Sequence, residues 1–232
     1  MNRKKILIAG GAGLVIIVLG LLWQQGFLGG DRRLYRSIKE NSELVSLFNA
    51  AKSKEAEISK DSEKPVPYLD AALDWKSIGE RVVDNKNDFF AKSLAVYERG
   101  IEKFGQGNVL FYLNAGHVAE SMGNYDKAGS YYMKAIEISP ADESGYLDLV
   151  NLYYYKLHKS KEEILPIFDA GLSKMAFTTP LISGRATYLR RIGAYAEALK
   201  DFQVLSRAFP GNLGYKEIIQ ELQNNIRQAS GK

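Results

Sequence analysis

Few residues in this sequence could take part in catalysis. The chain has no cysteine, so disulfides, thiolate zinc sites and cysteine nucleophiles are excluded. It has two histidines, His117 and His158, too few for a histidine metal cluster. His117 lies near Glu120 and Asp126 in the sequence, but no set of nucleophile, base and orienting group can be recognised around them. We therefore expect a binding protein rather than an enzyme, with no catalytic residue, no metal and no cofactor.

Composition and charge point to a folded chain without a nucleic-acid surface. Of the 232 residues, 46% are hydrophobic and 25% are charged, which is typical of globular proteins rather than disordered ones. The formal net charge is +4. Arg3, Lys4 and Lys5 supply three of these charges before the first apolar segment, so the rest of the chain is nearly balanced.

Residues 6–23 form the most apolar segment and contain no charged side chain. As a helix this segment would be about 27 Å long, close to the roughly 30 Å of a bilayer's hydrocarbon core. We expect a basic N-terminal tail at 1–5 and an uncleaved transmembrane signal anchor at 6–23. A cleaved signal peptide is the alternative, although the apolar run is long and no small-residue cleavage site follows it. The bases of the short tail favour a cytoplasmic N-terminus, which would place the following residues on the extracytoplasmic side of a single-pass protein.

Residues 24–64 are expected to form a juxtamembrane helix or linker. Four apolar residues recur near helical spacing and predict an amphipathic helix over about 31–51: Leu34, Ile38, Val45 and Phe48. Residues 50–64 are rich in charges of both signs. They could form a docking or lipid-surface helix, a solvated spacer, or a continuation of the preceding helix.

Two stretches of the sequence, seventy residues apart, are similar to each other. In the first, Gly123-Asn124-Tyr125 is followed by Ala128, Tyr132, Ala135 and Pro140. In the second, Gly193-Ala194-Tyr195 is followed by Ala198, Phe202, Leu205 and Pro210. Such a repeat indicates a chain built from stacked structural units.

The pattern resembles the tetratricopeptide repeat, a family whose 34-residue unit is a pair of antiparallel helices. The resemblance implies an all-α solenoid over residues 65–212, followed by a capping helix and tail at 213–232, because a single helix pair cannot bury its apolar face alone. The four expected units are approximately residues 72–108, 109–142, 143–178 and 179–212. The third unit departs most from the family pattern, since Val150 and Ile164 are large where small residues are expected and Pro166 falls within its second helix.

The resemblance also implies a function. In this family the first helices of the units line a concave groove that binds peptides or proteins. The matching groove residues here are Leu110, Leu113, Asn114, His117, Glu120, Leu147, Asn151, Tyr154, Tyr155, Ser183, Thr187, Arg190 and Arg191. These side chains could hold an extended or helical peptide, with a carboxylate near the two arginines. Equally, each tyrosine could belong partly to the core, and the arginines could form a solvated face.

The groove does not reproduce the family's two-carboxylate clamp, because Glu80, Ser144 and Asp148 stand where an amide and basic groups are needed. We expect a membrane-anchored adaptor or scaffold for a protein or peptide partner within an envelope assembly or secretion complex. One alternative is a self-associating structural scaffold, a homo-oligomer in which Ala9 and Gly13 could pack the anchor helices. The other is an exported chaperone-like holdase.

Overall fold

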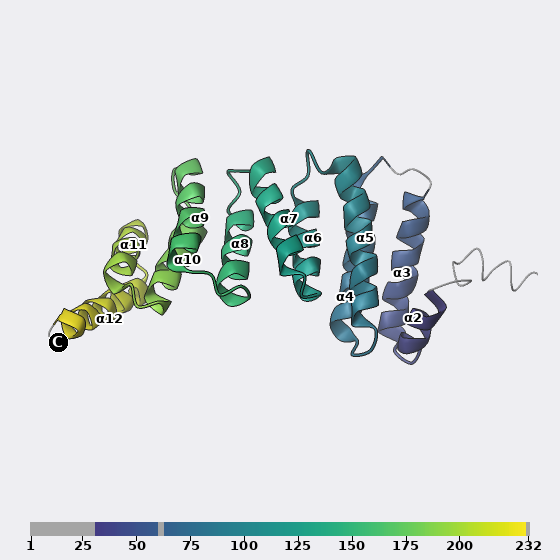
Figure 1. Ribbon diagram of the computed structural model, residues 1–232, viewed down its shortest axis with the longest axis horizontal. Helices are drawn as coiled ribbons and strands as arrows, with labels where there is room; N and C mark the ends of the chain where they lie inside the picture. Colours follow the sequence, from purple (N-terminus) through teal and green to yellow (C-terminus); the bar gives the residue numbers. More distant parts are fainter. Residues whose placement is uncertain (1–30, 60–62, 231–232) are drawn as a thin grey trace, which may run out of the picture. The chain divides into compact units, whose positions relative to one another are not determined.

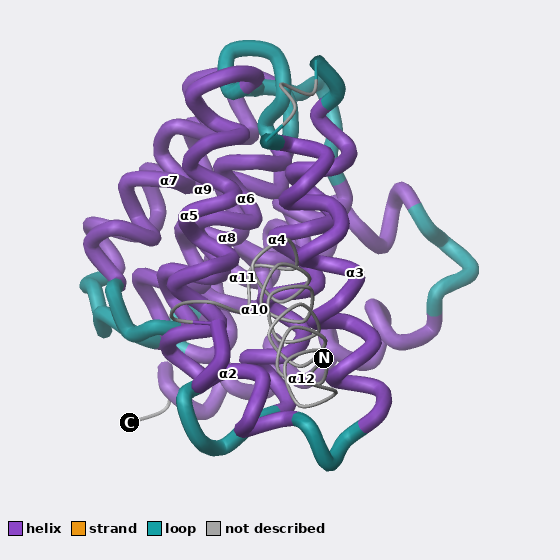
Figure 2. Tube along the Cα trace, turned by 90° about the vertical axis from the view of Figure 1, so that its right-hand side faces the viewer, coloured by secondary structure: helices purple, strands orange, loops and turns teal. Residues whose placement is uncertain are grey.

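The computed structural model describes residues 31–59 and 63–230, which fold into eleven α-helices and no strand (Figures 1 and 2). The all-α prediction is therefore confirmed for these residues. They belong to two compact units, unit 1 (Met1–Gly105) and unit 2 (Gln106–Lys232). The expected membrane segment, 6–23, lies outside the described residues. Among the helices that are described, none is long and apolar enough to cross a membrane.

Unit 1 contains four described helices, which are α2 (Asp31–Ile38), α3 (Ser42–Ile58), α4 (Pro65–Arg81) and α5 (Lys86–Phe104). The single helix expected over 31–51 is instead two helices, because Asn41 interrupts it. Its side-chain oxygen accepts hydrogen bonds from the backbone N–H groups of Glu43 and Leu44, which caps the start of α3.

The core of unit 1 forms around Trp75 of α4, which is fully buried. Phe48 of α3 meets the Trp75 ring edge to face, with ring centroids 5.1 Å apart. The indole N–H of Trp75 donates to Oε1 of Glu55 at 3.0 Å, so the polar end of the ring is satisfied. Ala51 and Ile58 are buried as well. The charged segment that begins at residue 50 is therefore, as far as Ile58, a packed continuation of α3 rather than a solvated spacer.

Asp31, the first residue of α2, joins three helices of unit 1. Its carboxylate lies 3.0 Å from Nζ of Lys52 on α3 and 2.6 Å from Nζ of Lys92 on α5. Burial acts to raise the pKa of Asp31, but the hydrogen bonds and charges of Lys92 and Lys52 outweigh it, so the pKa is lowered. The charged form of Asp31 therefore stabilises the folded unit.

Unit 2 contains three helical hairpins followed by one further helix, α12 (Leu213–Ser230). The hairpins are α6 (Leu110–Ser121) with α7 (Tyr125–Ile138), α8 (Glu143–Tyr155) with α9 (Lys161–Lys174), and α10 (Thr179–Arg191) with α11 (Tyr195–Ala208). Successive helices pack in chain order (Figure 1), which is the arrangement expected for stacked repeats.

The turns within the hairpins explain why the third expected unit departs most from the repeat pattern. Gly123 and Gly193 adopt φ of +76° and +78°, the left-handed conformation that allows a tight turn between paired helices. The α8–α9 turn is longer, running from 156 to 160, and His158 takes the positive φ there. The extra residues shift α9 in the repeat register, so that Phe168 occupies the buried aromatic position.

The paired helices approach closely where a glycine faces a ring. Gly116 of α6 packs on Tyr132 of α7 so tightly that a Cβ at this position would overlap the ring. Gly171 of α9 is similar, since a Cβ there would lie 2.8 Å from Cδ1 of Leu181 and 3.1 Å from Cγ of Tyr146. These contacts set the spacing between helices in unit 2.

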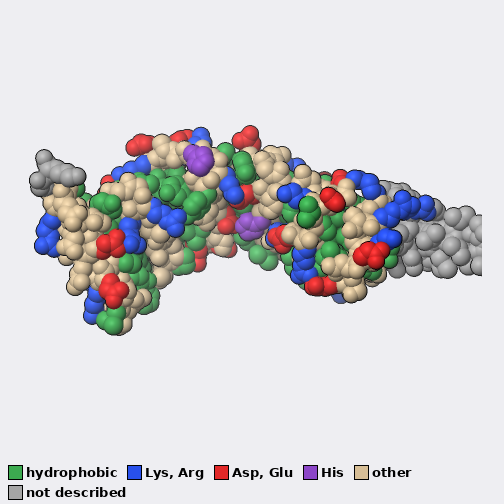
Figure 3. All heavy atoms as spheres, turned by 90° about the horizontal axis from the view of Figure 1, so that it is seen from below, with side chains coloured by type: hydrophobic (Ala, Val, Ile, Leu, Met, Phe, Trp, Pro, Cys, Tyr) green, Lys and Arg blue, Asp and Glu red, His purple; other side chains and the backbone are tan. Residues whose placement is uncertain are grey.

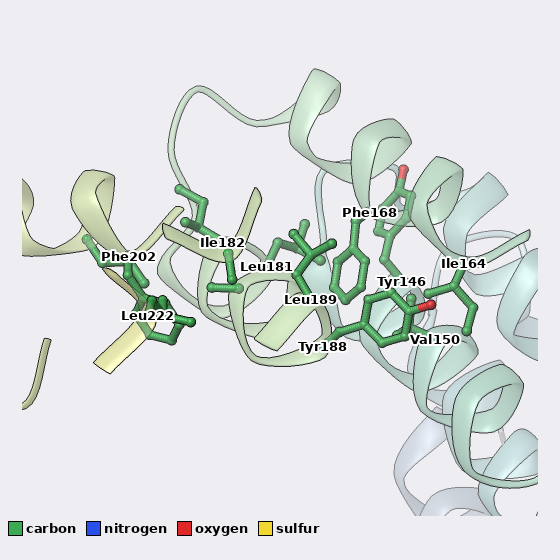
Figure 4. Close-up of a cluster of buried hydrophobic side chains, with 13 residues drawn as sticks. Tyr146, Val150, Ile164, Phe168, Leu181, Ile182, Tyr188, Leu189, Phe202 and Leu222 are labelled. Carbon is green, nitrogen blue, oxygen red and sulfur yellow. The ribbon is translucent and has the colours of Figure 1, made fainter. Parts of the chain in front are cut away.

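One hydrophobic cluster runs through α8 to α12 (Figure 4). Its larger members are Tyr146, Val150, Ile164, Phe168, Leu181, Ile182, Tyr188, Leu189, Phe202, Leu205 and Leu222. Leu222 is the fully buried residue of α12, whereas Leu213 at the start of that helix is 66% exposed. Helix α12 therefore covers α11 with one side and presents mainly polar residues elsewhere, as a capping helix must.

We predict that Gly116→Ala destabilises unit 2 by about 1–3 kcal/mol, because the added methyl group displaces the Tyr132 ring. In an open helix position the same change would be stabilising. Thermal unfolding followed by circular dichroism measures the effect. Gly211→Ala is the matched control, since nothing lies within 4 Å of a Cβ there. An unchanged melting temperature for Gly116→Ala would contradict the described contact.

A second prediction concerns the stability of unit 1 at low pH. Because the folded-state pKa of Asp31 is lowered, its contribution to stability is present above its ordinary value of 3.8 and is lost as the pH falls through the lowered pKa. Asp31→Asn should destabilise unit 1 by about 1–2 kcal/mol at pH 7 and have less effect at pH 2–3. Urea unfolding at both pH values, with the exposed Glu57→Gln as control, measures this difference. An equal effect at both pH values would refute the assignment.

Candidate functional site

A cleft of about 320 Å³ opens between α8 and α10 in unit 2. Helix α8 supplies one side, helix α10 supplies the other, and Phe168 reaches in from α9. The complete lining is Leu147, Val150, Asn151, Tyr154, Tyr155, Phe168, Pro180, Ser183, Gly184, Thr187, Tyr188 and Arg191. We call this feature the α8–α10 cleft.

Four aromatic rings form a connected wall in the α8–α10 cleft. The ring of Tyr154 meets that of Tyr188 edge to face, with centroids 5.3 Å apart, and that of Tyr155 at 4.8 Å. Phe168 lies behind Tyr188 at 6.1 Å. Burial, together with the nearby Tyr154 and Glu162, raises the pKa of Tyr188. Its phenol is therefore neutral at physiological pH and able to donate a hydrogen bond.

The floor of the cleft depends on Gly184 of α10, which has no side chain to fill the space. A Cβ at this position would lie 3.1 Å from Cδ2 of Leu147 and 3.2 Å from Cε1 of Phe168. A larger residue would press on both side chains and narrow the cleft. The absence of a side chain at residue 184 is thus one reason that a cavity exists between two adjacent repeats.

Arg191 lies at the edge of the cleft and is oriented by Tyr155. Its guanidinium is 5.6 Å from the centre of the Tyr155 ring, a cation–π distance, and its Nη1 donates to the hydroxyl of Tyr155. Arg191 is exposed, as are Asn151 and Thr187, while Ser183 is half-buried. The polar groups of the lining are therefore accessible to a ligand.

The structure brings seven of the expected groove residues together around this cleft. They are Leu147, Asn151, Tyr154, Tyr155, Ser183, Thr187 and Arg191. All seven come from the first helices of the second and third hairpins of unit 2, in agreement with the register inferred from the repeat.

The other expected groove residues lie elsewhere. Leu113 is only 7% exposed and belongs to the core between α6, α7 and α8, so it is not available to a ligand. Arg190 turns away from the cleft toward α12, where its Nε and Nη2 donate to the two carboxylate oxygens of Glu221 at 3.1 and 2.6 Å. Of the two arginines expected near a ligand carboxylate, only Arg191 lines the cleft, because neighbouring residues on a helix point in different directions.

Helix α6 carries the remaining expected residues, and none of them lines the α8–α10 cleft. His117 Nε2 lies 2.9 Å from Oδ2 of Asp148, which joins α6 to α8. Glu120 accepts a hydrogen bond from the Tyr132 hydroxyl at 3.1 Å within the first hairpin. Asn114 is half-buried, and Leu110 is 50% exposed at the start of the helix.

Five lining residues were not anticipated from the sequence, namely Val150, Phe168, Pro180, Gly184 and Tyr188. Pro180 and Gly184 occupy the second and sixth positions of their repeat, which the groove register does include. Tyr188 and Val150 lie outside the groove register, and both are buried. Phe168 comes from a second helix, and only the extra residues in the α8–α9 turn bring it into place.

The residues that line the cleft can bind a ligand through apolar contacts, hydrogen bonds and a single positive charge. Arg191 is the one residue of the lining with a formal charge. In the part of the chain that the structure describes, no group of three or more His, Cys, Asp or Glu side chains could hold a metal ion. Acidic and basic side chains are interspersed on the face seen in Figure 3 rather than gathered by sign.

Comparisons with known proteins agree on the type of fold. Residues 110–142, the α6–α7 hairpin, match the model of the tetratricopeptide repeat. Among solved structures, the chain is similar to that of YrrB, described as "a TPR protein with an unusual peptide-binding site". The TM-score is 0.52 at 19% sequence identity, over 76% of this chain and 85% of that one. No curated protein sequence matches the chain. The chain thus has a helical-repeat fold of the tetratricopeptide type.

We predict that Arg190 stabilises the docking of α12 and contributes nothing to the cleft. In a double-mutant cycle of Arg190→Met and Glu221→Gln, the coupling energy should be about 0.2–1 kcal/mol, as for other exposed ion pairs. Urea unfolding measures it, and the coupling should shrink in high salt. A zero coupling at low salt would show that the two side chains do not pair in solution.

Proposed function

We propose that unit 2 binds a peptide segment of a partner protein in the α8–α10 cleft. The observation that carries this proposal is the cleft itself, in which an aromatic wall, exposed amide and hydroxyl groups and one arginine converge on a cavity of about 320 Å³. That volume lies at the lower end of the range typical of ligand pockets, roughly 300–1,000 Å³. It could accommodate one or two side chains of a longer segment that continues along the surface.

The chemistry of the lining favours a peptide. Exposed Asn151 and Thr187 can pair with backbone N–H and C=O groups, which every peptide presents whatever its sequence. The rings of Tyr154 and Tyr188 offer apolar area at low entropic cost, because each side chain is already held edge to face against another. The similar protein YrrB is described as having a peptide-binding site, which is consistent with this proposal.

A membrane location is a separate proposal, and it depends on residues 6–23, whose apolar character is a property of the sequence. In this proposal the segment anchors a single-pass protein and the residues after it, 24–232, lie on the extracytoplasmic side. A cleft beside a bilayer would let the protein act as an adaptor or scaffold, recruiting a partner to an assembly or secretion complex of the envelope.

We predict that Thr187→Trp blocks peptide binding. A random 12-residue peptide library displayed on phage would be selected against the full chain in detergent solution. Binding of the selected peptides, synthesised with a fluorophore, would then be measured by anisotropy. Thr187 is exposed in the cleft, so an indole at this position fills the cavity without disturbing the core. Binding should weaken by roughly tenfold or more, equivalent to about 1.4 kcal/mol.

The matched control is Gln203→Trp, which adds the same side chain at an exposed position on α11, outside the cleft. This variant should bind the selected peptides as the wild type does. Equal binding by Thr187→Trp and the wild type would place the peptide elsewhere. A selection that yields no binding peptide at all would contradict the proposed function.

The proposed topology has its own test, a reporter fused after Lys232. Alkaline phosphatase, which becomes active only outside the reducing cytoplasm, should be active in this fusion in a bacterial host, and a green fluorescent protein fusion should be dark. The fusion should also remain in the membrane fraction after alkaline carbonate extraction. The opposite reporter pattern, or extraction into the soluble fraction, would refute the proposed anchor and orientation.

A further inference from the structure

We infer that the α8–α10 cleft selects peptide segments in which a large apolar side chain is accompanied by a neighbouring carboxylate. The carboxylate can come from Asp, from Glu or from the C-terminus of the peptide, because all three present the same pair of oxygens. This inference rests on the proposed function and specifies its ligand.

The α8–α10 cleft carries a positive charge. Arg191 is the charged residue of the lining, and within the described part of unit 2 it forms no ion pair with a carboxylate. Its neighbour Arg190 provides the contrast, since Glu221 neutralises it through two hydrogen bonds. The acids Asp148 on α8 and Glu162 on α9 do not line the cleft, although Glu162 is close enough to Tyr188 to act on its pKa. An anionic group in the ligand would therefore meet a positive charge that no carboxylate of the lining neutralises.

The positive charge of Arg191 is held in one orientation by Tyr155. The guanidinium of Arg191 is held over the Tyr155 ring and bonded to the Tyr155 hydroxyl through Nη1. A guanidinium has five N–H donors, and this hydrogen bond uses one of them. A carboxylate can therefore approach the remaining donors in the two-pronged geometry that arginine favours. Because Tyr155 already fixes the side chain, less entropy is lost when the ligand binds.

Part of the cleft lining is apolar. Leu147, Val150 and Phe168 supply apolar side chains to the lining, and the missing side chain at Gly184 leaves the space beside them open. A small or polar side chain would leave these apolar surfaces in contact with water, whereas a Leu, Ile, Met, Phe or Trp side chain would cover them. The cleft therefore presents an apolar seat and a cation on the same short stretch of surface.

The test uses the phage-selected 12-residue peptides and two variants of the full chain. Arg191→Met keeps most of the side-chain stem but removes the charge, and Arg207→Met removes the same charge from α11, outside the cleft. The selected peptides should be enriched in an acid close to a large apolar residue. Arg191→Met should bind such a peptide roughly three- to tenfold more weakly, and Arg207→Met should bind it as the wild type does.

Altered peptides identify the interacting group. When the acid is changed to its amide, or the free C-terminus is amidated, only the change that removes the contacting carboxylate should weaken binding. That altered peptide should then bind the wild type and Arg191→Met equally. Raising the salt concentration should weaken binding to the wild type more than binding to Arg191→Met. Replacing the large apolar residue of the peptide by Ala should weaken binding to both proteins.

Three results would overturn the inference. Selected peptides that contain no Asp or Glu, bind equally well with an amidated C-terminus and still lose binding in Thr187→Trp would leave the proposed function standing and refute the ligand chemistry. Peptides whose binding is unaffected by both Thr187→Trp and Arg191→Met would refute the cleft as the site. Peptide binding that fails as the chain dimerises, measured by sedimentation, would show that a second copy of the chain occupies the cleft.

Discussion

The architecture of unit 2 depends on one recurring contact, in which a residue without a side chain on one helix faces a bulky side chain on the next. Gly116 against Tyr132 sets the spacing of the first hairpin, and Gly171 against Tyr146 and Leu181 sets the position of the second hairpin relative to its neighbours. Since the interior of a protein is as closely packed as a crystal, the tolerance at such contacts is a few tenths of an ångström. A substitution there must displace the facing side chain, which is itself held in the core.

The same constraint accounts for the cleft. Stacked hairpins place their first helices on a common side, so α8 and α10 become neighbours although most of a hairpin separates them in the chain. At Gly184 a Cβ would lie 3.1 Å from Leu147 and 3.2 Å from Phe168, so the missing side chain keeps the space beside these two lining residues clear. A glycine, which elsewhere in unit 2 allows two helices to pack closely, thus leaves room for a ligand at this position. The polar residues at the rim of the cleft occupy positions that are not needed for packing between the helices.

Features of the fold and of the site that depend on residues close together in the sequence could be predicted. Features that depend on contacts between distant residues could not. The turns at Gly123 and Gly193 and the burial of Tyr132 were predictable because they depend on local spacing. The division of the expected 31–51 helix into two was not predicted, because it depends on the Asn41 side chain, which caps the start of α3. In the candidate site, Arg190 and Arg191 are equivalent in the sequence, and only the position of Glu221 on α12 separates their roles. Phe168 enters the cleft because of two features far apart in the chain, a longer α8–α9 turn and a glycine on α10.

A crystal structure of the full chain with a selected peptide would show whether the α8–α10 cleft is the binding site. We expect the peptide to lie between α8 and α10, with an apolar side chain against Phe168 and Tyr188 and a carboxylate oxygen within hydrogen-bonding distance of the Arg191 guanidinium. A peptide found instead in the charged cavity of about 250 Å³ beside Arg185 and Asp201, which α9, α10 and α11 line, would contradict this expectation.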